Sequence, residues 1–336
     1  MKNKFTYLII FIAIIALLII AYLKVNNTEP ISKTGYYLDT ICTITVYDMK
    51  EKDANDAIDN TFEVCSYYEN LLSKTIDSSD VSKINGAAGE WVTVDEDTLE
   101  LIKKGVYYSD LTEGAFDITV GRLTDLWDFH GVNPVLPDEL DIEEAVKHIG
   151  YENIVIDGND IKMVDPEAKI DLGGIAKGYI ADKVTEALEE SGVTSAVVNL
   201  GGNIVAIGNK NNGDDFVIGI ERPYSQMTEI VGTVKVRNST VVTSGVYERN
   251  FEYRGKVYHH ILDIETGYPV ESDLEAVSLV ANKGMSMDCD ALSTICLILG
   301  SKKGMEIIEE TEGVEAMFIT TDGDYIFSEN FIFYEK

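Results

Sequence analysis

Basic residues and histidines are scarce in this chain. Lys and Arg number 27 against 58 Asp and Glu, which gives a formal net charge of −31 over 336 residues, and there are only 4 His. Because so acidic a surface repels phosphate backbones, we expect no nucleic-acid partner. Proline is also scarce, with 6 residues, and hydrophobic residues make up 45%. The chain is therefore neither disordered nor collagen-like, and it can bury a core.

Cysteines are too few and too scattered for a disulfide framework. The four are Cys42, Cys65, Cys289 and Cys296. The last two fall in one expected helix, where two turns separate Cα atoms by about 10 Å, beyond the limit of about 7 Å for a bridge. No C-x-x-C motif or His/Cys cluster indicates a zinc or redox site. We expect four buried thiols that act as small hydrophobic side chains.

One long hydrophobic run stands apart from the acidic remainder. Residues 5–23 carry no charge, and at about 1.5 Å per residue they span roughly 28 Å, close to the hydrocarbon core of a bilayer. Lys2 and Lys4 precede the run, which places the N-terminus in the cytoplasm. A cleaved signal peptide is the alternative, but its apolar region is usually about 7 to 15 residues long, and no A-x-A-like site follows Ala21.

These features predict three segments. Residues 1–24 form an uncleaved membrane anchor, residues 25–34 a polar linker, and residues 35–336 one compact domain without an internal linker. The predicted location is the cell membrane, with a single span and the domain on the extracytoplasmic side.

Hydrophobic periodicity predicts an α+β fold. Apolar spacing of three and four predicts helices at residues 53–72, 95–110, 138–149, 171–192 and 288–300. Alternation predicts strands at 41–47, 195–199, 215–221, 230–237, 240–244, 315–320 and 325–333, and hairpins at 154–165 and 250–262. Because hairpins dominate the second half, we expect a mostly antiparallel sheet flanked by helices rather than a doubly wound parallel sheet.

The segment DLGGIAKGY at residues 171–179 is a candidate phosphate site. A strand that turns into a helix here would offer free backbone N–H groups, a positive helix end and Lys177 in the first turn, which suit a phosphate or pyrophosphate. The spacing matches neither a Walker A nor a G-x-G-x-x-G loop. The alternative is that the glycines only ease the turn and that Lys177 is solvated.

A second candidate lies at the start of the predicted helix near residue 288. Asp290 and Thr294 are four residues apart, so a carboxylate and a hydroxyl lie on one helix face. Two such hard oxygens, with a backbone carbonyl and phosphate oxygens, are what Mg²⁺ prefers. The alternative is that Asp288 or Asp290 only caps the helix.

Two further segments could carry chemistry. His259 and His260 face opposite sides of a predicted strand, so one of them at most points into a site, where it could act as a general base. A surface histidine pair is the alternative. In the loop near residue 116, Asp117 could accept hydrogen bonds from a ligand, while Phe116 could stack on it or only pack.

Taken together, the motifs resemble one family. In chain order GAFDITVG, DLGGIAKGY, NLGGNI, SGVYERNF, HHILDIETGYP and DALST resemble the ApbE family of flavin transferases over nearly all of residues 36–333. The resemblance implies an exported, Mg²⁺-dependent FAD:protein FMN transferase. Such an enzyme attaches FMN from FAD to a threonine of a partner protein through a phosphoester bond and releases AMP. The resemblance also implies a T-fold-like element.

The resemblance assigns roles to individual residues. It implies a metal site of Asp290, Thr294 and a backbone carbonyl, that of Gly174, and it implies His260 as the catalytic base. The FAD contacts that it implies are Leu38, Ala115, Phe116, Asp117, Asp171, Lys177 and Ile264. Leu38 stands where the family often has Met, and Ile264 where Pro commonly follows the Asp.

The acceptors implied by the resemblance are membrane redox or ion-pumping subunits and exported flavoproteins. Two alternatives are an FAD pyrophosphatase that yields FMN and AMP, and a non-enzymatic exported flavin-binding protein. Because FAD is itself an anion, the acidic chain needs local positive groups at its site. We expect Mg²⁺, Lys177 and a helix end to provide them.

Overall fold

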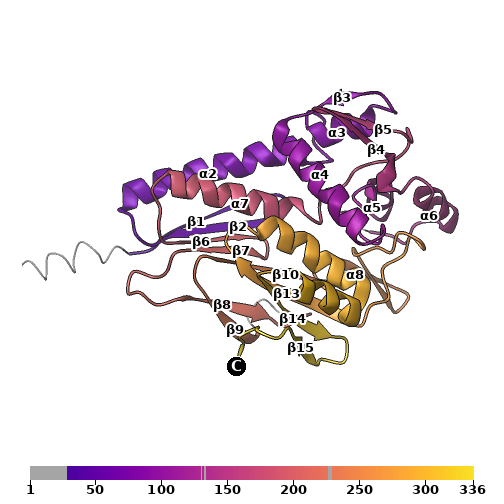
Figure 1. Ribbon diagram of the computed structural model, residues 1–336. Coiled ribbons are helices and arrows are strands. Elements are labelled where there is room, and N and C mark those ends of the chain that lie inside the picture. Colours follow the sequence, from indigo (N-terminus) through magenta and orange to yellow (C-terminus); the bar gives the residue numbers. More distant parts are fainter. Residues whose placement is uncertain (1–28, 130, 132–133, 226–228) are drawn as a thin grey trace, which may run out of the picture.

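An eight-stranded antiparallel sheet runs through the middle of the protein (Figure 1). The computed structural model describes residues 29–129, 131, 134–225 and 229–336. In spatial order the strands are β1 (Ile31–Tyr37), β2 (Thr40–Val46), β6 (Ala196–Leu200), β7 (Asn203–Ile207), β10 (Ser239–Gly245), β13 (Leu274–Asn282), β14 (Val314–Thr320) and β15 (Tyr325–Phe327). Every neighbouring pair is antiparallel, so the predicted sheet type is confirmed.

Both faces of this sheet are covered, and side chains alternate between two cores. Helices α2 (Glu51–Leu72), α7 (Ala176–Glu190) and α8 (Ser286–Glu310) cover one face. A small sheet of β8 (Phe216–Glu221), β9 (Ile230–Val236) and β16 (Tyr334–Glu335) covers the other. Val242 and Val277 pack in the helix-side core, and their neighbours Val241 and Ala276 pack in the other. This is the period of two that a strand imposes.

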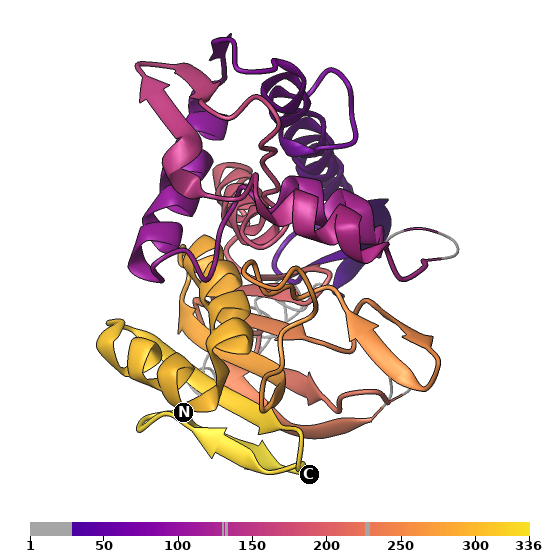
Figure 2. The same cartoon turned by 90° about the vertical axis from the view of Figure 1, so that its right-hand side faces the viewer.

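A smaller group of elements lies over one end of the sheet and its helices (Figure 2). It comprises α3 (Asp80–Gly86), α4 (Glu96–Leu111), α5 (Gly121–Trp127), α6 (Glu139–Val146), the short helix η1 (Tyr151–Asn153), and the sheet of β3 (Val92–Thr93), β4 (Ile154–Asp157) and β5 (Asp160–Met163). The hairpin of β11 (Asn250–Tyr253) and β12 (Lys256–His259) joins this group through a third core that contains Leu123, Trp127 and Tyr258. Because α3, α4 and β5 share the helix-side core with the main sheet, the two groups form one domain.

Most predicted elements are present. Helices begin and end within a few residues of the prediction at α2, α4 and α6, and the hairpin at 154–165 is formed by β4 and β5. The four cysteines are buried and unbridged. The predicted membrane anchor lies outside the described residues. In the part of the chain that is described, no helix is long and apolar enough to span a membrane.

Several predictions were wrong in detail. Ile31 to Thr34, assigned to a linker, belong to β1, because they pair with β2. Strand β13 was missed, because burial on both faces removes the polar alternation that marks a strand. The strand predicted at 325–333 ends at Phe327. The last predicted helix does end at Gly300, where the backbone turns out of the helix (φ 78°, ψ 174°), but a second helical segment that was not predicted follows it and completes α8 to Glu310.

Helices α7 and α8 meet at their N-terminal ends, and the contact depends on one glycine. A Cβ on Gly178 would lie 2.1 Å from the Ser286 carbonyl oxygen and 2.7 Å from Asp290 Cβ. Only a residue without a side chain allows the two helix starts to approach this closely. Gly178 therefore determines how the 171–179 segment lies against the start of α8.

We expect Gly178→Ala to lower the free energy of unfolding by about 1–3 kcal/mol, because the added methyl group must push α7 and α8 apart. Urea unfolding followed by circular dichroism measures the change. Gly86→Ala is the control, since open space surrounds the position of its Cβ. Equal stability of the Gly178→Ala variant and the wild type would contradict the close contact.

Candidate functional site

A buried carboxylate, that of Asp290, lies where three elements meet. Asp290 belongs to α8 and is 1% exposed. Its Oδ2 accepts a hydrogen bond from the Gly178 backbone N–H of α7 (3.0 Å), and its Oδ1 accepts one from Asn203 Nδ2 of β7 (3.1 Å). Lys177 Nζ lies 3.3 Å from Oδ1. These partners offset the cost of burying a charge.

The alternative that Asp288 or Asp290 caps α8 is wrong. The helix begins at Ser286, so Asp290 lies one turn inside it. The free N–H groups of Ser286 and Met287 donate instead to the Asp182 carboxylate of α7, at 3.2 and 3.0 Å. Asp182 of the neighbouring helix thus caps α8, and the Asp290 carboxylate is not used as a cap.

The three residues expected to hold a metal lie together. Thr294 Oγ1 donates to the Asp290 carbonyl (3.3 Å), which keeps both side chains on one face of α8. A Cβ on Gly174 would lie 3.7 Å from Thr294 Cγ2 and 3.0 Å from the Phe116 ring. The turn at residues 171–174 therefore contacts α8 beside Thr294, with Phe116 closing it on another side.

The donors around Asp290 suit a hard cation. A carboxylate, a hydroxyl and a backbone carbonyl are oxygen ligands of the kind that Mg²⁺ takes. Beside them the buried amide oxygen of Asn203, whose Nδ2 donates to Asp290, has no hydrogen-bond partner. Among the described residues, no three His, Cys, Asp or Glu side chains gather as a metal cluster. A cation held here would thus depend on the hydroxyl and the carbonyl as well as on Asp290.

Asp171 holds the 171–174 turn in shape. Its Oδ1 accepts from the Gly173 N–H (2.8 Å) and its Oδ2 from Thr124 Oγ1 (2.6 Å), while Lys74 Nζ lies 3.0 Å away. Burial opposes ionisation, but the charge of Lys74 and these hydrogen bonds outweigh it and lower the pKa of Asp171 to about 2. Its carboxylate is engaged within the protein, and its expected place along FAD stays a prediction.

The loop at residues 114–117 lies against this turn. Phe116 is buried next to Gly174, and a Cβ on Gly114 would come within 3.8 Å of Ile264 Cδ1. The structure therefore places Ala115, Phe116 and Ile264 around one loop. Asp117 is buried there, where it accepts from Thr119 N and Oγ1 (both 2.7 Å) and from Tyr151 N (2.8 Å). Burial raises its pKa.

Leu38 lies at the same end of the sheet as Asn203. With Asp39 it forms the two-residue turn between β1 and β2, and both residues have left-handed φ values of 57° and 55°. A Cβ on Gly201 would lie 2.4 Å from Thr40 Oγ1, so the Leu38 turn borders the glycine turn that precedes Asn203. The Leu38 N–H donates to Glu69 Oε1 at 2.8 Å.

His260 follows directly after β12 and is fixed by one carbonyl. The Arg249 oxygen accepts from the His260 backbone N–H (3.1 Å) and lies 3.2 Å from Nδ1. Because a carbonyl only accepts, Nδ1 carries the proton and Nε2 keeps its lone pair. Burial, and then the charges of Arg249, His259 and Lys177, lower the pKa of His260 to about 3. Its imidazole is therefore neutral at pH 7.

Residues 244–249, part of the SGVYERNF motif, connect α8 to His260, and no local pattern in the sequence indicates this connection. At one end Ser244 Oγ lies 2.7 Å from Ser293 Oγ, next to Thr294. At the other end is the Arg249 carbonyl that holds His260. Between them lies Glu248. Its side chain is exposed at the surface, but the protein around it removes part of its hydration. Burial and the charge of Asp290 raise its pKa to about 7, against the effect of Lys177 and Arg249.

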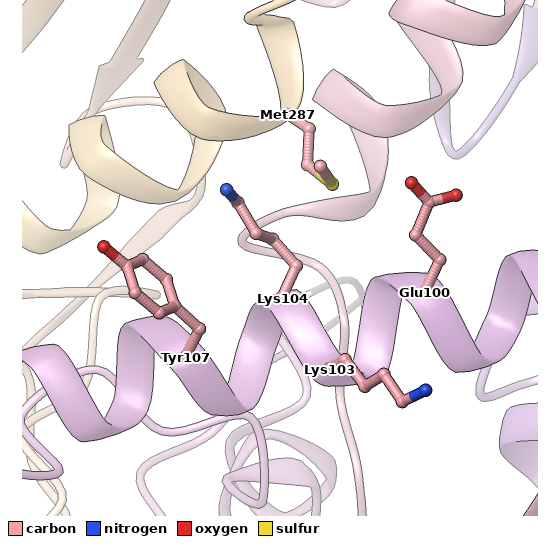
Figure 3. Close-up of a pocket in the computed structure, with 5 residues that line it drawn as sticks. All are labelled: Glu100, Lys103, Lys104, Tyr107 and Met287. Atoms are coloured by element: carbon pink, nitrogen blue, oxygen red, sulfur yellow. The ribbon is translucent and has the colours of Figure 1, made fainter. Parts of the chain in front are cut away.

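A surface pocket of about 380 Å³ lies elsewhere, between α4 and the start of α8 (Figure 3). It is lined by Glu100, Lys103, Lys104, Tyr107 and Met287. Lys104 Nζ is paired with Asp288 at 2.6 Å on this side of α8. Asp290 lies two residues later, and two residues turn a helix by about 200°, so its side chain points away from that of Asp288. It faces α7 and β7 instead. The pocket is therefore separate from the residues around Asp290.

We expect the two histidines to make stability fall below neutral pH. Their unfolded pKa is near 6.5, while the folded values are about 4 for His259 and about 3 for His260, so the unfolded chain binds more protons in acid. The contribution of the neutral histidines to the free energy of unfolding is complete above pH 6.5. As the pH falls toward 4, each histidine loses up to about 1.4 kcal/mol of this contribution per pH unit.

Urea unfolding between pH 7.5 and 4.5 measures this loss. His259→Gln should flatten the pH dependence relative to the wild type. Parallel curves for the His259→Gln variant and the wild type would contradict a buried neutral His259.

Comparisons with known proteins find the same family by sequence and by structure. A model of the ApbE family matches residues 38–318. An FAD:protein FMN transferase of Klebsiella pneumoniae (strain 342) is 35% identical over 272 residues, which cover 80% of this chain and 83% of that protein. Among solved structures, the ApbE protein of Thermotoga maritima has a TM-score of 0.81 at 35% identity, covering 90% of this chain and 97% of that one. The flavin transferase ApbE of Vibrio cholerae has a TM-score of 0.79 at 28% identity, covering 90% and 98%.

Proposed function

This chain belongs to the ApbE family, and we propose from that premise that it is an FAD:protein FMN transferase. It transfers the FMN moiety of FAD to a threonine hydroxyl of an acceptor protein and releases AMP. One observation carries the proposal: Asp290, Thr294 and the Gly174 backbone lie together at the meeting of α7 and α8. The expected T-fold-like element stays a prediction.

The start of α7 suits the pyrophosphate of FAD. In its first turn the Ala176 N–H donates to the Leu172 carbonyl and the Gly178 N–H donates to Asp290, so the positive end of the helix dipole, rather than a set of free N–H groups, would favour an anion there. Lys177 adds a cation beside it. These groups supply locally the positive potential that the acidic chain lacks as a whole.

The donors around Asp290 would hold Mg²⁺ through the Asp290 carboxylate, the Thr294 hydroxyl and the Gly174 carbonyl. When bound, the ion would neutralise negative charge on the pyrophosphate oxygens. Lys177 would then exchange part of its pairing with Asp290 for contact with a phosphate oxygen. Asn203 and the Gly178 N–H keep the carboxylate oriented throughout.

His260 is the proposed proton acceptor. Its Nε2 takes the proton of the threonine hydroxyl while the hydroxyl oxygen bonds to the FMN-side phosphorus. The bond from that phosphorus to the bridging oxygen breaks, and AMP leaves with the electron pair. The pKa of free His260 is low for this task. The negative pyrophosphate opposes the charges of Arg249 and Lys177, so we expect FAD binding to raise it.

We further propose the location and the partners that the sequence indicates. Residues 5–23 anchor the chain as a single span in the cell membrane, and the domain works on the extracytoplasmic side. The acceptors are then membrane redox or ion-pumping subunits and exported flavoproteins. Mass spectrometry of membrane proteins from cells with and without the gene would identify those that carry FMN.

We expect Asp290→Asn to abolish metal-dependent transfer. The reaction contains the full-length protein, FAD, MgCl₂ and an acceptor domain, and the readout is the FMN mass on an acceptor threonine. EDTA should stop the wild type. The matched control is Asp288→Asn on the same helix, which faces Lys104 instead and should keep its activity. Unchanged labelling by Asp290→Asn would contradict the metal assignment.

We expect His260→Gln to bind FAD normally but to transfer FMN about 10²- to 10⁴-fold more slowly, which is the usual contribution of a general base. FAD fluorescence measures binding, and the FMN mass measures transfer. The neighbouring variant His259→Gln is the control. Steady AMP release from FAD without an acceptor would favour the alternative of an FAD pyrophosphatase. Bound flavin without any AMP release would favour the alternative of a non-enzymatic flavin-binding protein.

A further inference from the structure

Helix α5 begins against the extended segment that leads into the 171–174 turn. Val120 and Lys169 form a parallel bridge, and the Gly121 N–H donates to the Lys169 carbonyl at 2.9 Å. A Cβ on Gly121 would lie 2.7 Å from that carbonyl oxygen, so the two backbones touch. The start of α5 is therefore fixed to the backbone just before Asp171.

One turn further along, α5 contacts the 171–174 turn itself. Thr124 Oγ1 lies 2.6 Å from Asp171 Oδ2, and Lys74 Nζ lies 2.6 Å from the same hydroxyl. Asp171 in turn holds the Gly173 N–H. Thr124 thus connects α5 to the turn that carries Gly174, on the metal and phosphate side of the site.

The last residue of α5, Trp127, contacts the chain on both sides of His260. Its indole is fully buried, and Nε1 donates to the Gly267 carbonyl at 2.8 Å. Its ring lies 5.6 Å from that of Tyr258 and 5.8 Å from that of Tyr268, between centroids. Tyr258 precedes His260 by two residues, while Gly267 and Tyr268 follow it.

The segment after His260 is closed by backbone hydrogen bonds, so its two ends are held together. The Val270 N–H donates to the Ile261 carbonyl (3.0 Å), and the Asp263 N–H donates to the Tyr268 carbonyl (2.8 Å). The Gly267 carbonyl that Trp127 holds therefore belongs to a unit whose first residue, Ile261, follows His260 directly. A shift of the indole would move this unit and the histidine together.

We propose that α5 is the element that positions His260 relative to the 171–174 turn, with Thr124 and Trp127 as positioning residues. They are three residues apart, so a single helical turn with a rise of about 4.5 Å joins the phosphate side of the site to the base. The inference rests on the proposed function, because it takes His260 as the proton acceptor. Errors of about 1 Å in such placement can cost about 10²-fold in rate.

Trp127→Phe tests this inference, since it removes the indole N–H but keeps an aromatic ring in the core. We expect kcat for FMN transfer to fall about 10-fold or more while KM for FAD stays within about twofold. Trp91→Phe, at a tryptophan that is 48% exposed, is the control and should match the wild type. Thr124→Val, which is nearly isosteric, should repeat the kcat effect if Trp127→Phe folds poorly.

Trp127→Phe combined with His260→Gln distinguishes an effect on the position of His260 from a general loss of structure. If Trp127 acts through His260, Trp127→Phe should change the slow residual rate by less than about twofold, measured as FMN mass over hours. A full effect in that background, or a change in KM rather than in kcat, would overturn the inference. If the wild-type protein shows no transfer activity, the proposed function is wrong and this inference is wrong with it. If the wild type is active and the Trp127→Phe variant is equally active, only the inference is overturned.

Discussion

The burial of the Asp290 carboxylate is the interaction on which the rest of the site depends. A charge with 1% exposure is tolerated only if donors surround it, and here they are the Gly178 N–H and Lys177 of α7 and Asn203 of β7. This requirement forces α7 against α8, which only a glycine at position 178 allows. The groups that make the burial possible are also those that suit a pyrophosphate, so stability and the proposed function share one set of contacts.

The proposed substrate is an anion, although the chain carries a net charge of −31. The structure concentrates positive groups at the site: Lys177 pairs with Asp290, and Lys177 and Arg249 both act on His260. Burial, and then the charges of Arg249 and Lys177, lower the pKa of His260 and keep it neutral in the free protein. Under the proposed function, bound FAD would reverse this effect, because its phosphates oppose the charges that depress the pKa of the histidine. Substrate binding would then prepare the base.

The local elements were largely predictable, because periodicity and turn residues lie close together in the chain. Helices α2, α4 and α6 and the β4–β5 hairpin follow from such patterns. Strand β13 does not, since both of its faces are buried and polar residues no longer alternate. The strand character of Ile31 to Thr34 was hidden as well. Those residues form β1 only because β2 is available to pair with them.

The sequence by itself determined the candidate residues, because Asp290 and Thr294 are one helical turn apart and DLGG precedes a helix. The tertiary structure alone decided what surrounds them. Asn203 and Asp290 are 87 positions apart, Thr124 and Asp171 are 47 apart, and Trp127 and Gly267 are 140 apart. No local pattern predicts such pairs, because they form only when separate elements pack. For that reason only the structure decided that Asp290 is a buried partner of α7 rather than a cap, and that α5 connects both halves of the site.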